Sequence, residues 1–367
     1  MSILKTLIAF LFRLFPLPTE PGLRIFGNPG ENSPVFVTSN FDLTVKRVSK
    51  YLKNLDCYLL IAPSKGINVW CASTGGFLNA HSIISVVKTS RIGEKVKHRR
   101  LILPQLSAPG IDTELIKKET GWHSKFGPVY AEDIPRYVKN KFKKTKEMNL
   151  VKFSFSARLE MAIMWAFSIS AIVAIPFAVF WPTSLLKVLS LIWGISLIMF
   201  LFYSYVPGKI GIQKALFLAL IFIGGFIFYS FLKGNLNINR IILWSLGSIV
   251  LLFIIGFDFE GSTPLYAGST TTFWSKKWPW VKKAWAKLGF KMEEFFAVNV
   301  DSEKCTGCRT CIEVCPLGVH EIDEESKKSK IVSLEKCVQC TACVRQCPEG
   351  AIWTEPPIKN LSKKFNL

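Results

Sequence analysis

The chain has 367 residues, with 46 Lys and Arg against 26 Asp and Glu, so its formal net charge is +20, and half of its residues are hydrophobic. Disordered chains combine high net charge with low hydrophobicity, and this composition therefore excludes one. It also excludes an ordinary soluble globule, unless the charged and apolar residues are segregated along the chain. At roughly 150 residues per domain, the length predicts two or three domains.

The apolar residues are concentrated in the middle of the chain. Four runs contain no charged residue, at 161–180, 188–206, 215–232 and 241–257. Each run is about as long as a helix that crosses the ~30 Å hydrocarbon core of a bilayer. We therefore predict a polytopic membrane protein, with an all-α transmembrane bundle of four spans over residues 153–260.

Two regions precede this membrane block. Residues 1–20 carry a short apolar stretch interrupted by Lys5 and Arg13, which predicts an interfacial anchor helix or, alternatively, a buried helix of the next domain. Residues 21–152 alternate short apolar runs with helical periodicity, which predicts a parallel, doubly wound (Rossmann-like) α/β domain. We expect strands at 35–38, 57–62, 67–71 and 101–103, and helices at 43–52, 78–88, 113–119 and 134–140.

A doubly wound sheet binds its ligand beyond the carboxyl ends of its strands. Thr38 and Asn40 follow one predicted strand, and Gln105 follows another. These positions therefore lie in loops where a ligand is expected.

Basic residues indicate the orientation of the spans. Lysines cluster before the first span and after the fourth, and Lys209 and Lys214 lie between the second and third. The positive-inside rule places these regions in the cytoplasm, although the opposite connections also carry three basic residues. We expect a multi-pass protein of the cytoplasmic membrane whose basic stretches contact anionic lipid rather than nucleic acid. Four spans place both soluble parts on the cytoplasmic side.

A basic linker, residues 261–297, leads into a cysteine-rich module at 298–367, where eight of the ten cysteines form two copies of C-x2-C-x2-C-x3-C-P. Three thiolates of each copy suit one iron–sulfur cube, and the fourth belongs to the other cube. Zinc sites do not need this spacing. The module resembles a bacterial dicluster ferredoxin, an α+β fold, over about residues 298–356, and its thiols require a reducing compartment. The predicted ligands of the two [4Fe-4S] clusters are Cys305, Cys308, Cys311 and Cys347 for one, and Cys337, Cys340, Cys343 and Cys315 for the other.

A ferredoxin supplies electrons, so their destination must lie elsewhere in the chain. We find no haem, flavin or nicotinamide motif, but Cys71 ends a predicted strand and precedes a turn of small residues and a helix. The partial positive charge at a helix amino terminus favours a thiolate, which makes Cys71 a candidate metal ligand or nucleophile. The alternative is a buried cysteine at a strand end, the role that we expect for Cys57.

Several segments are similar to the corrinoid protein family of microbial mercury methylation. They are Asn68-Val69-Trp70-Cys71-Ala72, His98-Arg99-Arg100-Leu101-Ile102-Leu103-Pro104-Gln105, Ala108-Pro109-Gly110, Gly127-Pro128-Val129-Tyr130 and Phe259-Glu260-Gly261-Ser262. The resemblance covers most of residues 21–268, and the cysteine-rich module resembles the separate ferredoxin partner of that protein. The chain therefore looks like a fusion of the two.

The resemblance implies a cobalamin-type corrinoid bound to the α/β domain, with Cys71 as the lower ligand of cobalt and as the catalytic residue. A methyl donor protein or a methylated folate or pterin would supply methyl, and Hg(II) or another soft species would accept it. The ferredoxin, fed by an upstream electron donor, would reduce cobalt to Co(I). The other residues implied to contact the corrinoid are Thr38, Asn40, Asn68, Val69, Trp70, Ala72, Ser73, Thr74, Gly75 and Gln105.

The sequence departs from the family pattern at three points. The family motif continues after Cys-Ala with a small residue, Gly and Lys, whereas this chain has Ser73, Thr74 and Gly75. No cysteine follows Cys347, and residues 274–296 are amphipathic and Lys-rich where the family has a fifth span. An even number of spans agrees with a covalently attached cytoplasmic ferredoxin.

Two hypotheses follow. The first is a membrane-bound, corrinoid-dependent methyltransferase with its own electron supply. The second is a membrane-anchored electron carrier whose α/β domain binds no corrinoid. Uptake of cobalamin separates the two hypotheses.

Overall fold

The computed structural model describes residues 11, 15–152, 154–203, 205–207, 211–234, 237–261 and 298–354. The chain divides into two compact units, and the soluble unit combines the described residues of Phe15–Val151 with those of Lys291–Leu367. The other, the membrane unit, contains the described residues of Met1–Leu14 and Lys152–Phe290. The predicted linker at 261–297, apart from its first residue, and most of the predicted anchor helix lie outside the described residues.

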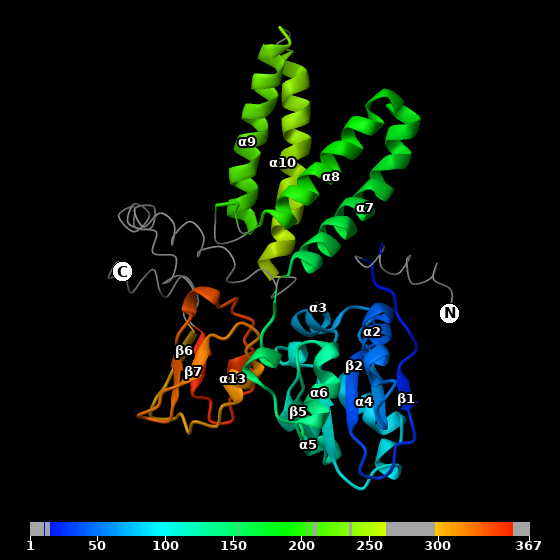
Figure 1. The fold of residues 1–367 in the computed structure, drawn as a ribbon, viewed down its shortest axis with the longest axis vertical. Coiled ribbons are helices and arrows are strands. Elements are labelled where there is room, and N and C mark those ends of the chain that lie inside the picture. The colour runs from blue at the N-terminus through cyan, green and yellow to red at the C-terminus, as the bar shows by residue number, and fades with distance from the viewer. Residues whose placement is uncertain are drawn as a thin grey trace. The chain divides into compact units, whose positions relative to one another are not determined.

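A five-stranded sheet is the centre of the α/β domain (Figure 1). Its strands lie in the order β1-β3-β2-β4-β5, and β1 runs antiparallel to β3 while the other neighbours are parallel. The strands are β1 (Gly22–Phe26), β2 (Val35–Ser39), β3 (Cys57–Ala62), β4 (Arg100–Leu103) and β5 (His123–Phe126).

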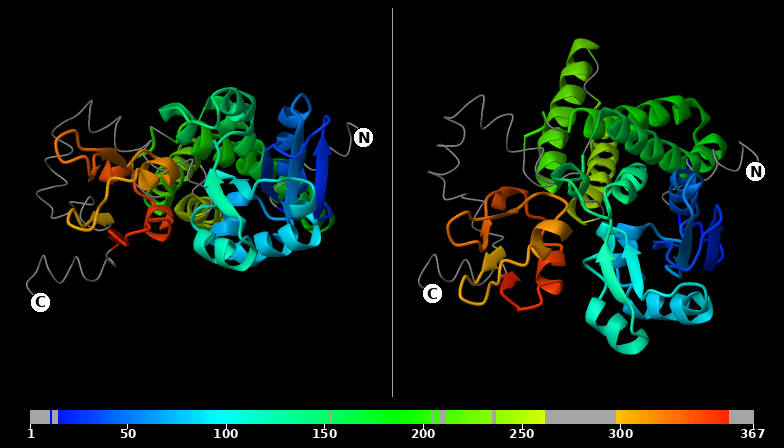
Figure 2. Two further views of the ribbon diagram at one scale, coloured as in Figure 1. Left: turned by 90° about the horizontal axis from the view of Figure 1, so that it is seen from below. Right: turned by 60° about the horizontal axis from the view of Figure 1, so that its bottom comes forward.

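Helices cover both faces of this sheet (Figure 2). In β2, Val35 and Val37 belong to one buried core and Phe36 to another, because alternate side chains of a strand point to opposite faces. The first core includes residues of α4 and the second includes residues of α2, so the α/β domain is doubly wound. The helices are α2 (Asp42–Leu52), α3 (Val69–Thr74), α4 (Ala80–Thr89), α5 (Thr113–Thr120) and α6 (Ile134–Lys139), with 3₁₀ turns at η1 (Ile92–Glu94), η2 (Gln105–Ser107), η3 (Ala131–Asp133) and η4 (Lys146–Asn149).

The predicted elements of this domain are confirmed except at three places. The strand expected at 67–71 is wrong, because Asn68 caps a helix that begins at Val69. β1 and β5 were not predicted, and the antiparallel β1 corrects the expectation of an all-parallel sheet. β5 alternates exposed His123 and Lys125 with the less exposed Ser124 and Phe126, but only Phe126 is apolar, so its sequence carries little strand signal.

The membrane unit contains four helices that are long and apolar enough to cross a membrane. They form two helical hairpins, α7 with α8 and α9 with α10 (Figure 1). Ile175, Leu186 and Leu243 are among the side chains that are more than two-thirds exposed, a surface suited to lipid. The helices are α7 (Phe155–Phe180), α8 (Leu185–Leu201), α9 (Gly211–Leu232) and α10 (Ile238–Gly261).

One of the lysines predicted to lie between spans has a different position. Lys214 lies within the first turns of α9 and is fully buried. Its Nζ donates to the carbonyl oxygens of Tyr203 (2.7 Å) and Val206 (2.6 Å), in the segment that follows α8. Lys214 therefore stabilises the connection between two helices and offers no charge at the surface.

The ferredoxin module consists of two small antiparallel sheets and two short helices. The sheets pair β6 with β9 and β7 with β8. The elements are β6 (Val298–Val300), α13 (Thr310–Val314), β7 (His320–Ile322), β8 (Ser329–Ile331), η8 (Leu334–Lys336), α14 (Ala342–Arg345) and β9 (Ile352–Thr354).

Candidate functional site

Cys71 lies in the first turn of α3. The side chain of Asn68 accepts a hydrogen bond from the backbone N–H of Cys71 (3.0 Å), which caps the helix. Trp70 and Ala72 are buried, whereas Cys71 is only half-buried and residues 74–77 are exposed. The helix thus buries Trp70 and Ala72, the residues on either side of Cys71. It leaves the thiol of Cys71 close in sequence to an exposed segment, which consists of three small residues followed by Phe77.

The sheet has a topological switch point between β2 and β4, because the chain passes from β2 to β3 on one side and then to β4 on the other. Open α/β sheets bind ligands at the carboxyl ends of such strands. At the end of β2, the hydroxyls of Thr38 and Ser39 are buried and have no hydrogen-bond partner among the residues that the structure describes. Buried hydroxyls rarely remain unpaired, so these two atoms suit a polar ligand at this edge.

Two other predicted contact residues are engaged within the chain. Asn40 accepts hydrogen bonds from Ser64 and from the N–H of Gly66 (2.9 Å), and donates to the carbonyl of Thr19 (3.1 Å). Gln105 donates to the carbonyl of Asn149 (2.9 Å). Both side chains position loops at the carboxyl edge of the sheet.

The turn after Cys71 is held to a neighbouring loop. The hydroxyl of Ser73 donates to the carbonyl of Ser107 (2.7 Å) and accepts from the N–H of Gly110 (2.8 Å). On the exposed side, Lys65 places its ammonium 4.6 Å from the ring centre of Phe77. A basic residue therefore lies beside α3, although the turn itself contains none.

Cys57 is the other cysteine of the α/β domain, and it differs from Cys71 as expected. Its side chain is fully buried in β3. Burial, and secondarily the charge of Asp56, raises the pKa of its thiol to about 12. A protonated thiol without access to solvent is a core residue, not a metal ligand.

The eight cysteines of the ferredoxin module line two separate cavities. We name the set Cys305, Cys308, Cys311 and Cys347 the first cysteine site, and the set Cys315, Cys337, Cys340 and Cys343 the second cysteine site. Each set combines three thiols of one motif with the fourth of the other motif, which is the arrangement that the spacing predicts. Within the described ranges, no three His, Cys, Asp or Glu side chains converge as a single metal ion would require. Four thiols around a cavity fit a polynuclear cluster.

The thiols of the second cysteine site are less accessible to solvent than those of the first. Burial raises the pKa of the Cys340 thiol to about 12 and also raises those of Cys315 and Cys343. Thiolates there need a positive partner, which iron ions supply by direct ligation. Across the two sites, backbone N–H groups donate to the sulfurs of Cys305, Cys315, Cys337 and Cys347, contacts that tune the reduction potential of a cluster.

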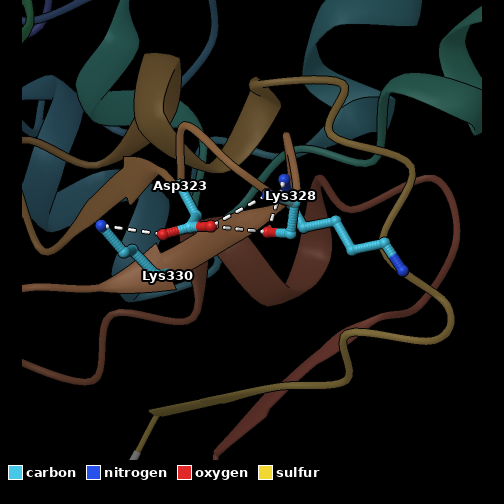
Figure 3. A network of polar contacts seen from close by, with 4 residues as sticks. Asp323, Lys328 and Lys330 are labelled. Atoms are coloured by element: carbon cyan, nitrogen blue, oxygen red, sulfur yellow. Dashed lines mark hydrogen bonds and ion pairs between the residues drawn. The ribbon is translucent and has the colours of Figure 1, made fainter.

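A polar turn supports the loop of the first cysteine site (Figure 3). Asp323 accepts hydrogen bonds from the N–H and hydroxyl of Ser326 and from Lys330 (each 3.0 Å), and these contacts hold the pKa of its carboxyl well below the usual range. The turn places the carbonyl of Lys327 so close to Gly307 that a Cβ there would lie 2.2 Å from the oxygen. Gly307 also has a φ of +72°, which favours glycine.

Sequence reasoning missed two polar residues that join the ferredoxin module to the α/β domain. They are Gln346, next to Cys347, and Lys144, in the segment before η4. Each is a common surface residue type, and its role depends on a partner more than 160 positions away in the chain.

In comparisons with known proteins, the α/β domain and the ferredoxin module match two different families. Residues 13–138 match the CdhD family, described as CO dehydrogenase/acetyl-CoA synthase delta subunit, and residues 297–348 match a 4Fe-4S dicluster domain. The gamma subunit of the acetyl-CoA decarbonylase/synthase complex of Methanothermobacter thermautotrophicus is 37% identical over 125 residues, which are 34% of this chain and 27% of that protein. The large subunit of the corrinoid/iron-sulfur protein of Moorella thermoacetica is 32% identical over 126 residues, 34% of this chain and 28% of that protein.

The chain thus spans about a quarter of the length of these curated relatives. The CdhD match contains Cys71 and every other predicted corrinoid contact. It supports a CdhD-like corrinoid/iron–sulfur protein joined to a dicluster ferredoxin domain. The finer resemblance to the mercury-methylation family stays a prediction.

Proposed function

We propose that this chain is a membrane-bound, corrinoid-dependent methyltransferase with a built-in electron supply. The observation that carries the proposal is the half-exposed Cys71 on α3, within a region similar to corrinoid/iron–sulfur proteins and in the same folded unit as a dicluster ferredoxin domain. When bound, a corrinoid supplies a cobalt centre that accepts a methyl group and passes it on.

Different residues of the chain would bind different parts of the corrinoid and the clusters. Cys71 would be the residue that holds cobalt, and the Asn68 cap fixes the backbone that carries its thiol. The exposed residues 74–77 would lie against the macrocycle, and the unpaired hydroxyls of Thr38 and Ser39 would hydrogen-bond its polar periphery. The first and second cysteine sites would each hold one [4Fe-4S] cluster.

The proposed acceptor of the methyl group is Hg(II) or another soft species. A thiolate ligand donates electron density to cobalt, and this favours release of the methyl group in a form that soft metal cations accept. The methyl donor is a methylated folate or pterin system, or a protein that carries it. We propose that the soluble unit performs this reaction on the cytoplasmic side.

Reconstitution with cobalamin tests the proposal. We expect the purified full chain to bind cobalamin, and we expect Cys71→Ala to change the cobalt absorption spectrum because the thiolate ligand is lost. Cys57→Ala is the matched control, since Cys57 is buried in the sheet. A wild-type chain that takes up no cobalamin, or a Cys71→Ala spectrum identical to that of wild type, contradicts the proposal.

The acceptor is tested separately with loaded protein supplied with methylcobalamin as the methyl source. Formation of methylmercury from Hg(II), lost in Cys71→Ala, supports mercury as the acceptor. Transfer to thiol compounds but not to Hg(II) would identify another soft acceptor and would leave the corrinoid role in place.

A further inference from the structure

The ferredoxin module shares a hydrophobic core with the α/β domain. Val314 of α13 and Ala342 of α14 are buried in the same core as Ala108 and Ile111, which follow β4. Cys340 and Cys343 pack against that core. Both thiols belong to the second cysteine site, so this site is the one that faces the α/β domain.

Gln346 fixes this contact with specific hydrogen bonds. Its side chain is 8% exposed, and its Nε2 donates to the carbonyl oxygens of Ala108 (2.9 Å) and Ile111 (2.6 Å). Its Oε1 accepts from the hydroxyl of Thr113 (3.1 Å). Gln346 lies between a ligand of the second site, Cys343, and a ligand of the first, Cys347.

The loop that hydrogen-bonds to Gln346 also hydrogen-bonds to α3. This loop, residues 105–111, binds Ser73 through the Ser107 carbonyl and the Gly110 N–H. The two backbones approach so closely that a Cβ on Gly110 would lie 2.4 Å from the carbonyl oxygen of Ser73. Ser73 is two residues from Cys71, so loop 105–111 contacts the ferredoxin module on one side and the Cys71 helix on the other.

Lys144 ties the start of the same loop to the ferredoxin module. Its Nζ donates to Oε1 of Gln105 (2.9 Å) and to the carbonyl of Glu313 in α13 (2.7 Å). The residue after α13 is Cys315, the fourth ligand of the second site. Loop 105–111 is thus anchored near two different thiols of that site.

The first cysteine site lies in a different environment. Cys308 is exposed, and among the described residues no thiol of the first site packs against the core that the module shares with the α/β domain. A separate core that contains Val298 and Ile352 holds one thiol of each site, Cys311 and Cys315. The two sites therefore differ in access: the first reaches solvent, and the second contacts the α/β domain.

Resting on the proposed function, we propose that electrons pass in a fixed order. An external donor reduces the cluster in the solvent-accessible first cysteine site, and the electron then moves to the second site and through loop 105–111 to the corrinoid on α3. Gln346 is the residue that positions this route. One electron leaves a low-potential external donor, such as another reduced ferredoxin, and one electron arrives at cobalt, reducing Co(II) to Co(I). Because Co(I) corrinoids are four-coordinate, the bond from Cys71 to cobalt would break in this reduction and leave a free thiolate, and no proton is transferred.

The test compares Gln346→Glu with wild type in the full chain carrying both clusters. The substitution keeps the shape of the side chain but replaces the donor Nε2 by an oxygen that faces two carbonyls. In protein without corrinoid, we expect hydrogen–deuterium exchange of the amides of Ser107, Ala108 and Gly110 to accelerate about tenfold, which corresponds to about 1.4 kcal/mol. In cobalamin-loaded protein, we expect stopped-flow reduction of Co(II) by dithionite to slow by about the same factor.

Arg345→Ala is the matched control, because Arg345 is exposed, ends α14 and directly precedes Gln346. It should change neither the amide exchange nor the reduction rate. Iron content and the rate of cluster bleaching by dithionite should equal wild type in both variants, which excludes a loss of clusters as the cause.

The proposal is overturned if Gln346→Glu and wild type have the same exchange rates for the amides of loop 105–111 and the same rate of Co(II) reduction. It is also overturned if Gln346→Glu and Arg345→Ala have equal effects. If the wild-type chain binds no cobalamin, the proposed function fails instead, and the exchange experiment still decides whether Gln346 couples the two parts. If Gln346→Glu does not fold, Gln346→Met, which removes the donor without adding charge, replaces it with the same expected results.

Discussion

Gly307 illustrates how a single residue determines a cluster site. The loop of the first cysteine site turns at this glycine, with a φ of +72° and the carbonyl of Lys327 directly against it. We expect Gly307→Ala to displace the loop, because the new Cβ would lie 2.2 Å from that oxygen. Iron content should fall from about eight to about four per chain, as expected when one of two four-iron clusters is lost.

Gly350→Ala is the control for backbone strain. Gly350 has a similar φ of +58°, but no atom lies within 4 Å of a Cβ built on it. Its iron content should stay at about eight per chain, the content of two four-iron clusters. Equal iron loss in both variants would show that strain, and not the close approach of Lys327, explains the result.

The position of Cys71 could be predicted only in part. The sequence places this cysteine shortly before the helix predicted at 78–88, whereas the structure places it in the first turn of a separate short helix, α3. The expected strand is wrong, because Ile67, Val69 and Trp70 favour strands by residue type, while the capping side chain of Asn68 decides for a helix. Gln346 and Lys144 could not be predicted, since their hydrogen bonds form only after distant segments fold together.

Among the secondary-structure elements, β7 of the ferredoxin module carries a titratable group in its core. His320 is 2% exposed, and burial lowers its pKa to about 4. The unfolded chain therefore binds a proton between pH 6.5 and 4 that the folded module does not bind. Stability falls as pH falls through this window, by about 2 kcal/mol at pH 5.

Urea unfolding of the ferredoxin module, followed between pH 7 and 5, measures this effect. We expect the midpoint to fall with pH in wild type and to fall much less in His320→Leu, which removes the buried imidazole. An equally steep fall in both proteins would assign the acid sensitivity to other groups, such as the cluster ligands.

Elements with a strong periodic pattern were predicted well. α2, α4 and the four membrane helices follow directly from their hydrophobic patterns, and β3 has the predicted bounds of 57–62. β1 escaped prediction because it is an edge strand with exposed residues, including Ile25. Edge strands are specified by their neighbour more than by their own alternation.

For the whole molecule, the soluble unit constrains how the chain crosses the membrane. Its two segments flank the membrane unit in sequence, yet they share a core and hydrogen bonds such as that from Val151 N–H to the Pro316 carbonyl (2.8 Å). Segments folded as one unit lie on the same side of a bilayer, which requires an even number of spans. The four apolar helices found among the described residues agree with this requirement.

Epitopes inserted after Lys53, in the α/β domain, and after Ser326, in the β7–β8 turn, test this arrangement. Both sites are exposed. We expect an impermeant protease to remove both epitopes in inside-out vesicles and neither in right-side-out vesicles. Removal of only one epitope in either preparation would contradict a single soluble unit on the cytoplasmic side.

The proposed function requires that Cys71 bind cobalt. The most direct measurement is X-ray absorption at the cobalt edge of the cobalamin-loaded full chain. We predict a sulfur scatterer in the first coordination shell of wild type and its absence in Cys71→Ala. A wild-type spectrum with only nitrogen and oxygen ligands, unchanged by the substitution, would contradict the account.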